Sequence, residues 1–464
     1  MMTYSSPPKE QVRLSPNEKE HGTAEGVIAR ALNVFANVEP GEAVTALLMT
    51  FAVFSLLTAY YLLKTAREPL ILLEGGAELK SYIALGQSIL LIPIVAGYTW
   101  IARKVGRLKL LAGIYLFFAM NLVLFAIMAR AHAKIGVVFF LWVGIFNGTA
   151  IAQFWSFAND IYTEEQGKRL FAIIGIGSSV GAVAGAKIAE LLIKVAGTSM
   201  LMIVAAVILI GCIAIMGVVE ARVSGKSVKE EAKDAEKKDE KPIVDTDAVR
   251  KLFKDKYLLL ISGLTIVLNC VNKTGEYMLD REILKSVAHD EKLIGAVKAD
   301  YFWWINLVGV LLQLFAVSRI LKYLGVRGAL FCLPIVSGIG YAASFVAPVF
   351  AIVRLAKIGE NAVDYSVQST ANQTLYLVTD RTEKYVGKTA IDTFVVRFGD
   401  AFSSGFVFVG KTLALSTRAF AGINLVVLVL WVVIVLAISR ENKRRSDEGK
   451  GEHRGGHEPE LQPA

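Results

Sequence analysis

Residues 351–378 read AIVRLAKIGENAVDYSVQSTANQTLYLV. A helix rises about 1.5 Å per residue, so roughly 20 residues cross a bilayer and this stretch is long enough to do so. Its polar side chains nevertheless recur at steps of three or four, which places them on one face of a helix: Arg354, Lys357, Asn361, Asp364, Gln368 and Asn372. A charge that faces lipid is energetically costly, so this polar stripe must face protein or water. The stripe predicts one wall of a pathway through a membrane protein.

Apolar runs of about the length of a membrane span recur from residue 44 almost to the end of the chain. Hydrophobic residues make up 54% of the 464 residues. We expect about twelve transmembrane helices, at residues 45–66, 81–101, 108–129, 135–158, 170–195, 199–220, 257–279, 294–318, 326–347, 350–378, 388–412 and 419–439. A β-barrel would show short alternating segments, whereas these runs are continuous. The sequence therefore predicts an all-α integral membrane protein.

The net charge of +9 follows the expected membrane topology. Basic residues cluster after the second, fourth, eighth, tenth and last spans: Arg103, Lys104, Arg107, Lys109, Lys168, Arg169, Arg319, Lys322, Arg327, Lys384, Lys388, Arg440, Lys443, Arg444 and Arg445. Loops rich in Lys and Arg stay on the cytoplasmic side, which predicts a multi-pass protein of the bacterial inner membrane with both termini in the cytoplasm. The lipid bilayer is then the expected partner, and nucleic acid is not.

The two halves of the chain resemble each other. ARKVGRL (102–108) resembles LKYLGVR (321–327), and GKRLFAI (167–173) resembles GKTAIDT (387–393), each at a separation of roughly 220 residues. Two parallel six-span repeats are typical of the major facilitator fold, whose substrate site lies between the halves. We expect the following divisions: a cytoplasmic tail with an interfacial helix at 1–43, six-span halves at 44–220 and 257–440, a charged cytoplasmic linker at 221–256, and a disordered cytoplasmic tail at 441–464.

Polar side chains at helical spacing in three spans predict the substrate cavity. They are the tenth-span stripe, Asn269, Asn272, Lys273 and Glu276 in the seventh span, and Lys64 and Arg67 in the first. For the seventh span the alternative is hydrogen bonding between helices, and for the first it is an anchor at the membrane surface.

These candidate residues divide by chemistry. We expect the negative groups of an anionic solute to be bound by the cations Arg67, Lys273, Arg354 and Lys357. The amides that would orient its polar part are Asn269, Asn272, Gln368 and Asn372. Glu276 and Asp364 would balance buried positive charge or carry a proton, and the sequence leaves both roles open.

A second group of charges predicts a cytoplasmic gate: Asp160, Lys168, Arg169, Lys388, Asp392, Arg397 and Asp400. In a rocking transporter such charges hold one access state closed and separate in the other. Asp392, Arg397 and Asp400 share the eleventh span with Ser404, so one alternative is that this span lines the cavity. Arg397 and Asp400 lie one helical turn apart, so another is that they only neutralise each other.

Other patterns favour packing over chemistry. Gly177, Gly181 and Gly185 recur at four-residue spacing inside a span, which predicts close helix packing rather than a phosphate loop. The aromatic run 301–304 (YFWW) is typical of a belt at the membrane surface, with a stacking platform for a planar ligand as the alternative. Cysteine and histidine show no metal-ligand spacing, and the spans hold no nucleophile–base constellation, so neither a metal, a cofactor nor an enzyme is expected.

Four blocks resemble a known family. FWSFANDIYTEEQGKRLFAIIGIGSSVGAVAGA (154–186), EPGEA (39–43), YYLLKTAREPLIL (60–72) and YVGKTAIDTFVVRFGDA (385–401) resemble motifs of the ATP/ADP translocases of plastids and intracellular bacteria. That group of nucleotide transporters is a branch of the major facilitator superfamily. The resemblance covers roughly residues 35–440 and implies exchange of ATP for ADP and phosphate.

The resemblance also implies four charged intramembrane residues of alternating sign. The first-span lysine falls nearest Arg67, but the other three positions fall at uncharged residues, Val143, Asn272 and Asn372. Glu276 and Lys357 supply charges close to the last two.

We therefore expect an alternating-access transporter, a monomer, that moves a nucleotide or similar anionic solute. One rival is a transporter of a non-nucleotide anionic metabolite, with proton coupling as an option. The other is a membrane protein that handles lipid without transport.

Overall fold

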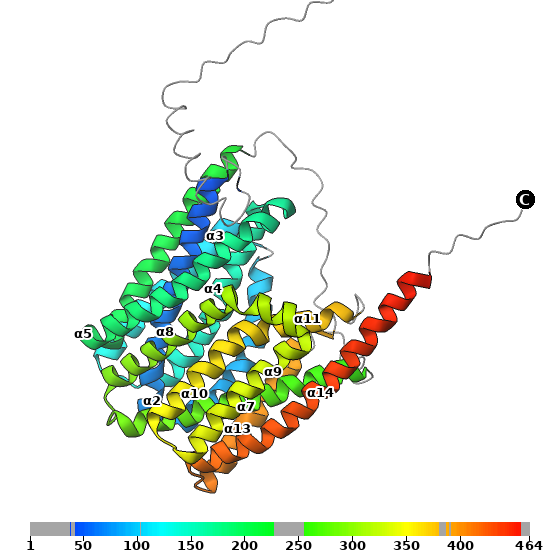
Figure 1. The fold of residues 1–464 in the computed structure, drawn as a ribbon. Helices are drawn as coiled ribbons and strands as arrows, with labels where there is room; N and C mark the ends of the chain where they lie inside the picture. The colour runs from blue at the N-terminus through cyan, green and yellow to red at the C-terminus, as the bar shows by residue number, and fades with distance from the viewer. Residues whose placement is uncertain are drawn as a thin grey trace, which may run out of the picture.

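The computed structural model describes residues 42–102, 104–226, 255–379 and 391–455, together with Val38, Gly387 and Lys388. Every regular element in these residues is helical (Figure 1). The expected interfacial helix and most of the expected linker lie outside the described residues.

The helices follow the predicted spans. The N-terminal half contains α2 (Ala43–Ala102), α3 (Arg107–Arg130), α4 (Gly136–Ile161) and α5 (Glu164–Lys226). The C-terminal half contains α7 (Lys256–Ser286), α8 (Glu291–Phe315), α9 (Val317–Val346), α10 (Phe350–Val363), η2 (Asp364–Gln368), α11 (Ser369–Leu375), η3 (Tyr376–Val378), η5 (Ile391–Val395), α13 (Val396–Thr412) and α14 (Thr417–Gly455). The last helix thus occupies part of the segment for which we expected disorder.

Two of these helices are double spans. Gly76 in α2 and Gly197 in α5 have φ values of +73° and +71°, the left-handed region that glycine adopts readily. Glu68 and Lys80 contact each other across the α2 break at 2.6 Å, whereas a straight helix would place them roughly 18 Å apart. The chain therefore reverses at this point, and α2 supplies the first two spans.

Within the described part of the chain, seven helices are long and apolar enough to cross a membrane: α2, α3, α4, α5, α7, α9 and α14. With α2 and α5 counted twice, and with α8, the composite α10–η3 segment and η5–α13 added, the described residues form the twelve predicted helical segments. The three added segments have a lower mean hydropathy than these seven helices because they carry more polar residues. The prediction of an all-α membrane protein is confirmed.

The glycine stripe of α5 packs directly on the first span. A Cβ atom at Gly181 would lie 2.4 Å from the backbone oxygen of Phe54, and one at Gly177 would lie 2.5 Å from that of Thr50. Cys212, beyond the Gly197 break, contacts the Ala52 oxygen, so both spans of α5 lie against the same part of α2. The packing role predicted for these glycines is confirmed.

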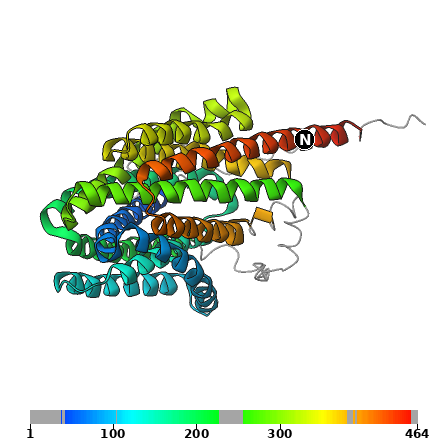
Figure 2. The same cartoon turned by 90° about the horizontal axis from the view of Figure 1, so that it is seen from below.

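In Figure 2 the cyan helices lie on one side and the yellow and red helices on the other, with the orange α13 beside the blue part of α2 between them. We call the end of the bundle that contains Gly76 and Gly197 the kink end, and the opposite end, where Lys226 and Lys256 lie, the linker end. In Figure 1 the linker end of the N-terminal half lies at the top, and α14 runs out to the right.

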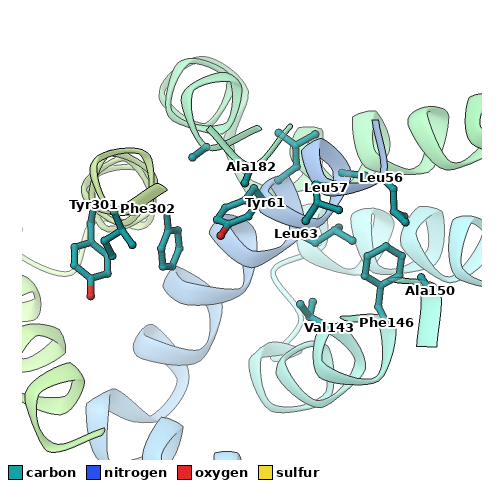
Figure 3. Packing of buried hydrophobic residues seen from close by; sticks show 14 of the residues in the cluster. Leu56, Leu57, Tyr61, Leu63, Val143, Phe146, Ala150, Ala182, Tyr301 and Phe302 are labelled. Atoms are coloured by element: carbon teal, nitrogen blue, oxygen red, sulfur yellow. The ribbon is translucent and has the colours of Figure 1, made fainter. Parts of the chain in front are cut away.

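An aromatic contact joins the halves in the interior. Figure 3 shows Tyr61 of α2 beside Phe302 of α8, with their ring centroids 6.2 Å apart. Tyr301 and Phe302 are only 2% and 6% exposed. The belt interpretation of these two residues is wrong, because they lie on the face of α8 that packs against α2 and α10 rather than on the lipid face.

Candidate functional site

A cavity of about 380 Å³ lies between the two halves. Its walls come from both spans of α2, from α4, α7 and α13, and from the π-helical η2. Eight charged residues line it: Lys64, Arg67, Lys80, Lys273, Glu276, Asp280, Arg397 and Asp400. Five are cations and three are carboxylates, so the lining carries a net positive charge. We call this space the charged cavity.

Both first-span cations lie against aromatic rings. The Lys64 ammonium lies 4.3 Å from the ring centroid of Phe302, and the Arg67 guanidinium lies 4.4 Å from that of Phe140. Arg67 also pairs with Glu68 at 2.9 Å. Aromatic faces attract a cation without neutralising its charge. Lys64 therefore keeps its charge available to an anion in the cavity.

A buried group of four charges seals the kink end of this cavity. Lys80 bridges Glu68 at 2.6 Å and Asp280 at 2.7 Å, and Lys298 contacts Glu68 at 3.3 Å and pairs with Asp280. Glu68 and Lys80 belong to the N-terminal half, and Asp280 and Lys298 to the C-terminal half. We call these four residues the charge quartet.

Further contacts across the halves lie at or near the kink end. Tyr277 donates to Glu78 at 2.9 Å, and Thr198 donates to Glu291 at 2.7 Å. Nearer the middle, Ser404 donates to the Ser81 oxygen at 2.9 Å. The halves are thus bonded together on the kink-end side of the cavity.

None of the four quartet residues was predicted as a site residue. A usable signal was present, because Lys80 and Lys298 are separated by about the same 220 residues as the repeat motifs. The two carboxylates lie in TAREPLIL (65–72) and LDREILKS (279–286), two segments that resemble each other more loosely at nearly the same separation.

Five of the twelve residues predicted to bind substrate line the charged cavity: Lys64, Arg67, Asn269, Lys273 and Glu276. They come from the first and seventh spans. Glu276 lies one turn from Lys273 and faces the same space. The structure thus brings together the parts of the prediction that rest on α2 and α7.

The tenth-span stripe faces protein instead. Lys357 is 1% exposed and donates to Glu360 at 2.8 Å and to the Asn272 oxygen at 3.1 Å. Asn272 in turn donates to Asn361 at 3.0 Å. Asn361 donates to Tyr301 at 2.7 Å. The stripe, together with Asn272, ties α10 to α7 and α8 within the C-terminal half.

The remaining stripe residues are also engaged within that half. Arg354 pairs with Asp300, Asp364 accepts from Asn272 at 3.4 Å, and Gln368 donates to Asn372 at 2.9 Å. None of the six stripe residues is among the lining of the charged cavity. Contact of these residues with substrate stays a prediction. The tenth span does reach the cavity through Tyr365, which is 50% exposed.

The predicted gate residues are dispersed. Arg397 and Asp400 lie 3.7 Å apart in the wall of the charged cavity. Arg169 pairs with Glu42 at 3.0 Å, and the Asp160 backbone oxygen accepts from Arg107 at 3.0 Å.

Lys388 donates to Gln373 at 2.7 Å, and Lys168 is exposed near the start of α5. The side chain of Asp392 lies outside the described part. These bonds of Arg169, Asp160 and Lys388 stay within one half, and a gate at the linker end stays a prediction.

Comparisons with known proteins agree with this architecture. Residues 49–279 match the family model of the Major Facilitator Superfamily. The nucleoside transporter NupG has a similar structure, with a TM-score of 0.61 at 10% identity, over 85% of this chain and 98% of that one. The chain has the fold of a membrane transporter of the major facilitator type.

Other solved structures share the fold of this transporter. A bacterial homologue of the iron transporter ferroportin, in an inward-facing state, gives a TM-score of 0.61 at 10% identity, over 85% and 98% of the two chains. A POT family transporter in complex with a thioalcohol-conjugated peptide gives 0.58 at 13% identity, over 86% and 96%. These proteins carry different substrates, so they show the fold alone.

One relative is an ADP,ATP carrier, which is the type of protein that the sequence motifs resemble. The transporter is 22% identical over 331 residues to ADP,ATP carrier protein 1 of Chlamydia pneumoniae. The match covers 62% of this chain and 63% of the relative's length.

Proposed function

We propose that the transporter moves a nucleotide or a similar anionic solute by alternating access. The observation that carries this proposal is the charged cavity, where five cations face three carboxylates between two six-span halves. Lys64 and Arg67 stand on one half and Lys273 and Arg397 on the other, so a polyanion in the cavity contacts both. Charge-assisted hydrogen bonds from such groups are the strongest that a protein offers to phosphate or carboxylate.

The access state follows from the charge quartet. The ion pairs and hydrogen bonds that join described residues of the two halves lie at the kink end or near the middle of the bundle. Under the positive-inside rule the basic loops of the linker end face the cytoplasm. We therefore infer an inward-facing state in a bacterial inner membrane, with both termini on the cytoplasmic side.

Rocking the halves about the cavity would open the kink end. Breaking the quartet exposes all four charges to water, which supplies the hydration that they lose when the halves close. A gate at the linker end would then form from charges that lie apart in this state, and Arg169 and Lys388 remain candidates for it. The chemistry is binding and conformational change, and no cofactor takes part in it.

The nucleotide assignment draws on the matched motifs and on the ADP,ATP carrier relative. A non-nucleotide anion is the second candidate, and specific residues favour it. The fourth-span position that the motif match assigns to a glutamate is Val143, which is fully buried among apolar side chains (Figure 3). Asn272 and Asn372 replace two further charges and lie outside the cavity wall. The charges that hold the solute are therefore partly this chain's own.

Exchange in proteoliposomes tests the proposal. Vesicles loaded with ADP should take up labelled ATP. Unlabelled ATP, ADP, pyrophosphate and citrate are then compared by how strongly each one reduces this uptake. Lys273→Gln removes one cavity cation and should lower uptake about tenfold or more, since a charged hydrogen bond contributes about 1.5–3 kcal/mol. Lys187→Gln is the matched control, because Lys187 pairs with Glu190 and does not line the charged cavity.

Competition by citrate but by no nucleotide would overturn the nucleotide assignment and leave anion transport standing. Uptake at the wild-type rate by Lys273→Gln would refute the role of the charged cavity.

A further inference from the structure

A second cavity of about 630 Å³ adjoins the charged cavity. It is lined by α2, α4, α5, α8 and η2, so it too lies between the halves. Tyr60 and Tyr365 belong to the walls of both cavities. These two rings therefore stand where the two cavities adjoin.

The two cavities differ sharply in charge. Among the described residues that line the second cavity, none carries a charged side chain, whereas eight do so in the first. The polar wall consists of amides and hydroxyls, from Tyr61, Asn147, Ser178, Ser179, Asn306 and Gln313. We call this space the neutral cavity.

One donor in this wall lacks an acceptor. Asn306 accepts a hydrogen bond from Tyr61 at 2.8 Å, but its amide nitrogen has no partner among the described residues. Buried polar groups are nearly always satisfied, so an unpaired donor beside a cavity indicates a place for an acceptor atom. An alkyl chain would leave this amide and those of Asn147 and Gln313 unpaired, which disfavours a lipid tail.

We propose that the solute has two chemically distinct ends: an anionic end held in the charged cavity, and a flat, uncharged end with hydrogen-bond acceptors held in the neutral cavity beside Tyr60 and Tyr365. This inference rests on the proposed function and narrows it. Aromatic side chains stack on planar heterocycles, and neutral amides read their edges without desolvating a charge. Small inorganic anions and short carboxylates occupy only the charged cavity and bind weakly. A nucleoside phosphate has both ends.

Filling the neutral cavity separates its role from that of the cations. A Cβ atom at Gly175, which lines the neutral cavity, meets nothing within 4 Å, so Gly175→Phe occupies the space without a backbone clash. Gly211 on the same helix also has open space around its Cβ position but lines neither cavity, and Gly211→Phe is the matched control. Lys273→Gln reports on the charged cavity.

The probes are ADP, inorganic pyrophosphate and adenosine, and the readout is the thermal stabilisation of the purified full-length transporter in detergent. Gly175→Phe should weaken ADP by about tenfold or more, abolish any binding of adenosine, and leave pyrophosphate within about twofold. Lys273→Gln should weaken pyrophosphate and ADP alike. Gly211→Phe should change none of the three.

Each contrary result has a distinct meaning. Equal weakening of ADP and pyrophosphate by Gly175→Phe, or no weakening of ADP, would overturn the two-ended solute while anion binding stands. Failure of wild-type protein to bind either anion would overturn the proposed function, and this inference would fall with it.

Discussion

The charge quartet should control which end of the transporter is open. Asp280→Asn keeps the side-chain shape but leaves Lys80 and Lys298 with one carboxylate, Glu68. Glu68, Asp280 and Lys298 have side chains only 1–2% exposed, so the uncompensated charge stays buried as long as the halves are closed at the kink end. Removing one partner of a buried ion pair costs about 3–5 kcal/mol. The wild-type quartet exists only in the closed state, so this cost falls on that state alone.

The closed-to-open ratio at the kink end should therefore fall by a factor between about a hundred and several thousand. Lys134 and Leu413 are exposed residues at the kink end, one on each half. Spin labels at these two positions report the change as a distance measured by double electron–electron resonance. Cys212, Cys270 and Cys332 are first replaced by alanine. The label distance should lengthen in Asp280→Asn relative to wild type.

Two further variants discriminate between a lock and a general loss of stability. Asp280→Leu with Lys298→Met restores neutrality and should return the distance toward the wild-type value, because a removed pair leaves no orphan charge. Lys194→Met breaks an exposed pair with Glu190 at the same end and should leave the distance unchanged. An unchanged distance in Asp280→Asn would refute the assignment of the quartet as a lock.

Two other predictions concern stability. Gly181→Leu forces α5 away from α2, since its Cβ atom would lie 2.4 Å from the Phe54 oxygen, and should lower the free energy of unfolding by about 1–3 kcal/mol or more. Gly211→Leu has open space around its Cβ position and should leave the stability unchanged. Thermal unfolding followed by fluorescence measures both variants. Asp255 caps α7 by accepting from the Leu258 N–H at 2.8 Å and pairs with Arg445 at 2.5 Å, so Asp255→Ala should cost about 1 kcal/mol. Burial opposes ionisation of Asp255, but the Leu258 N–H and the Arg445 guanidinium outweigh it and hold the pKa of Asp255 below its ordinary value of 3.8. The contribution is therefore present above pH 3.8 and lost as pH falls through the lowered pKa, so wild type and variant should converge in acid. A difference that grew as the pH fell would contradict this.

Span positions were predictable because apolar length and loop charge are local properties of the chain. The Gly177–Gly185 stripe was predictable for the same reason, since four-residue spacing alone puts small residues on one helix face. Periodicity also showed that the tenth-span stripe avoids lipid.

Periodicity does not say which protein surface a stripe meets. Lys357 and Asn361 turn toward α7 and α8, whereas Tyr365, which lies in the π-helical stretch that begins at Asp364, reaches the cavities. The quartet could not be predicted for a related reason. Each member is one charge near the end of a different span, and only the tertiary arrangement shows that the four meet.

The division of cavity cations between the halves has a kinetic consequence. Lys64 and Arg67 sit on the span that α5 grips through its glycines, and Lys273 moves with the other half. When the empty protein closes around the cavity, the cations of the two halves approach one another. Their repulsion raises the free-energy barrier that the empty protein must cross to return to the other access state. A bound polyanion screens the repulsion and lowers the barrier. On the proposed function, the loaded protein crosses faster than the empty one, and net flux gives way to one-for-one counterflow.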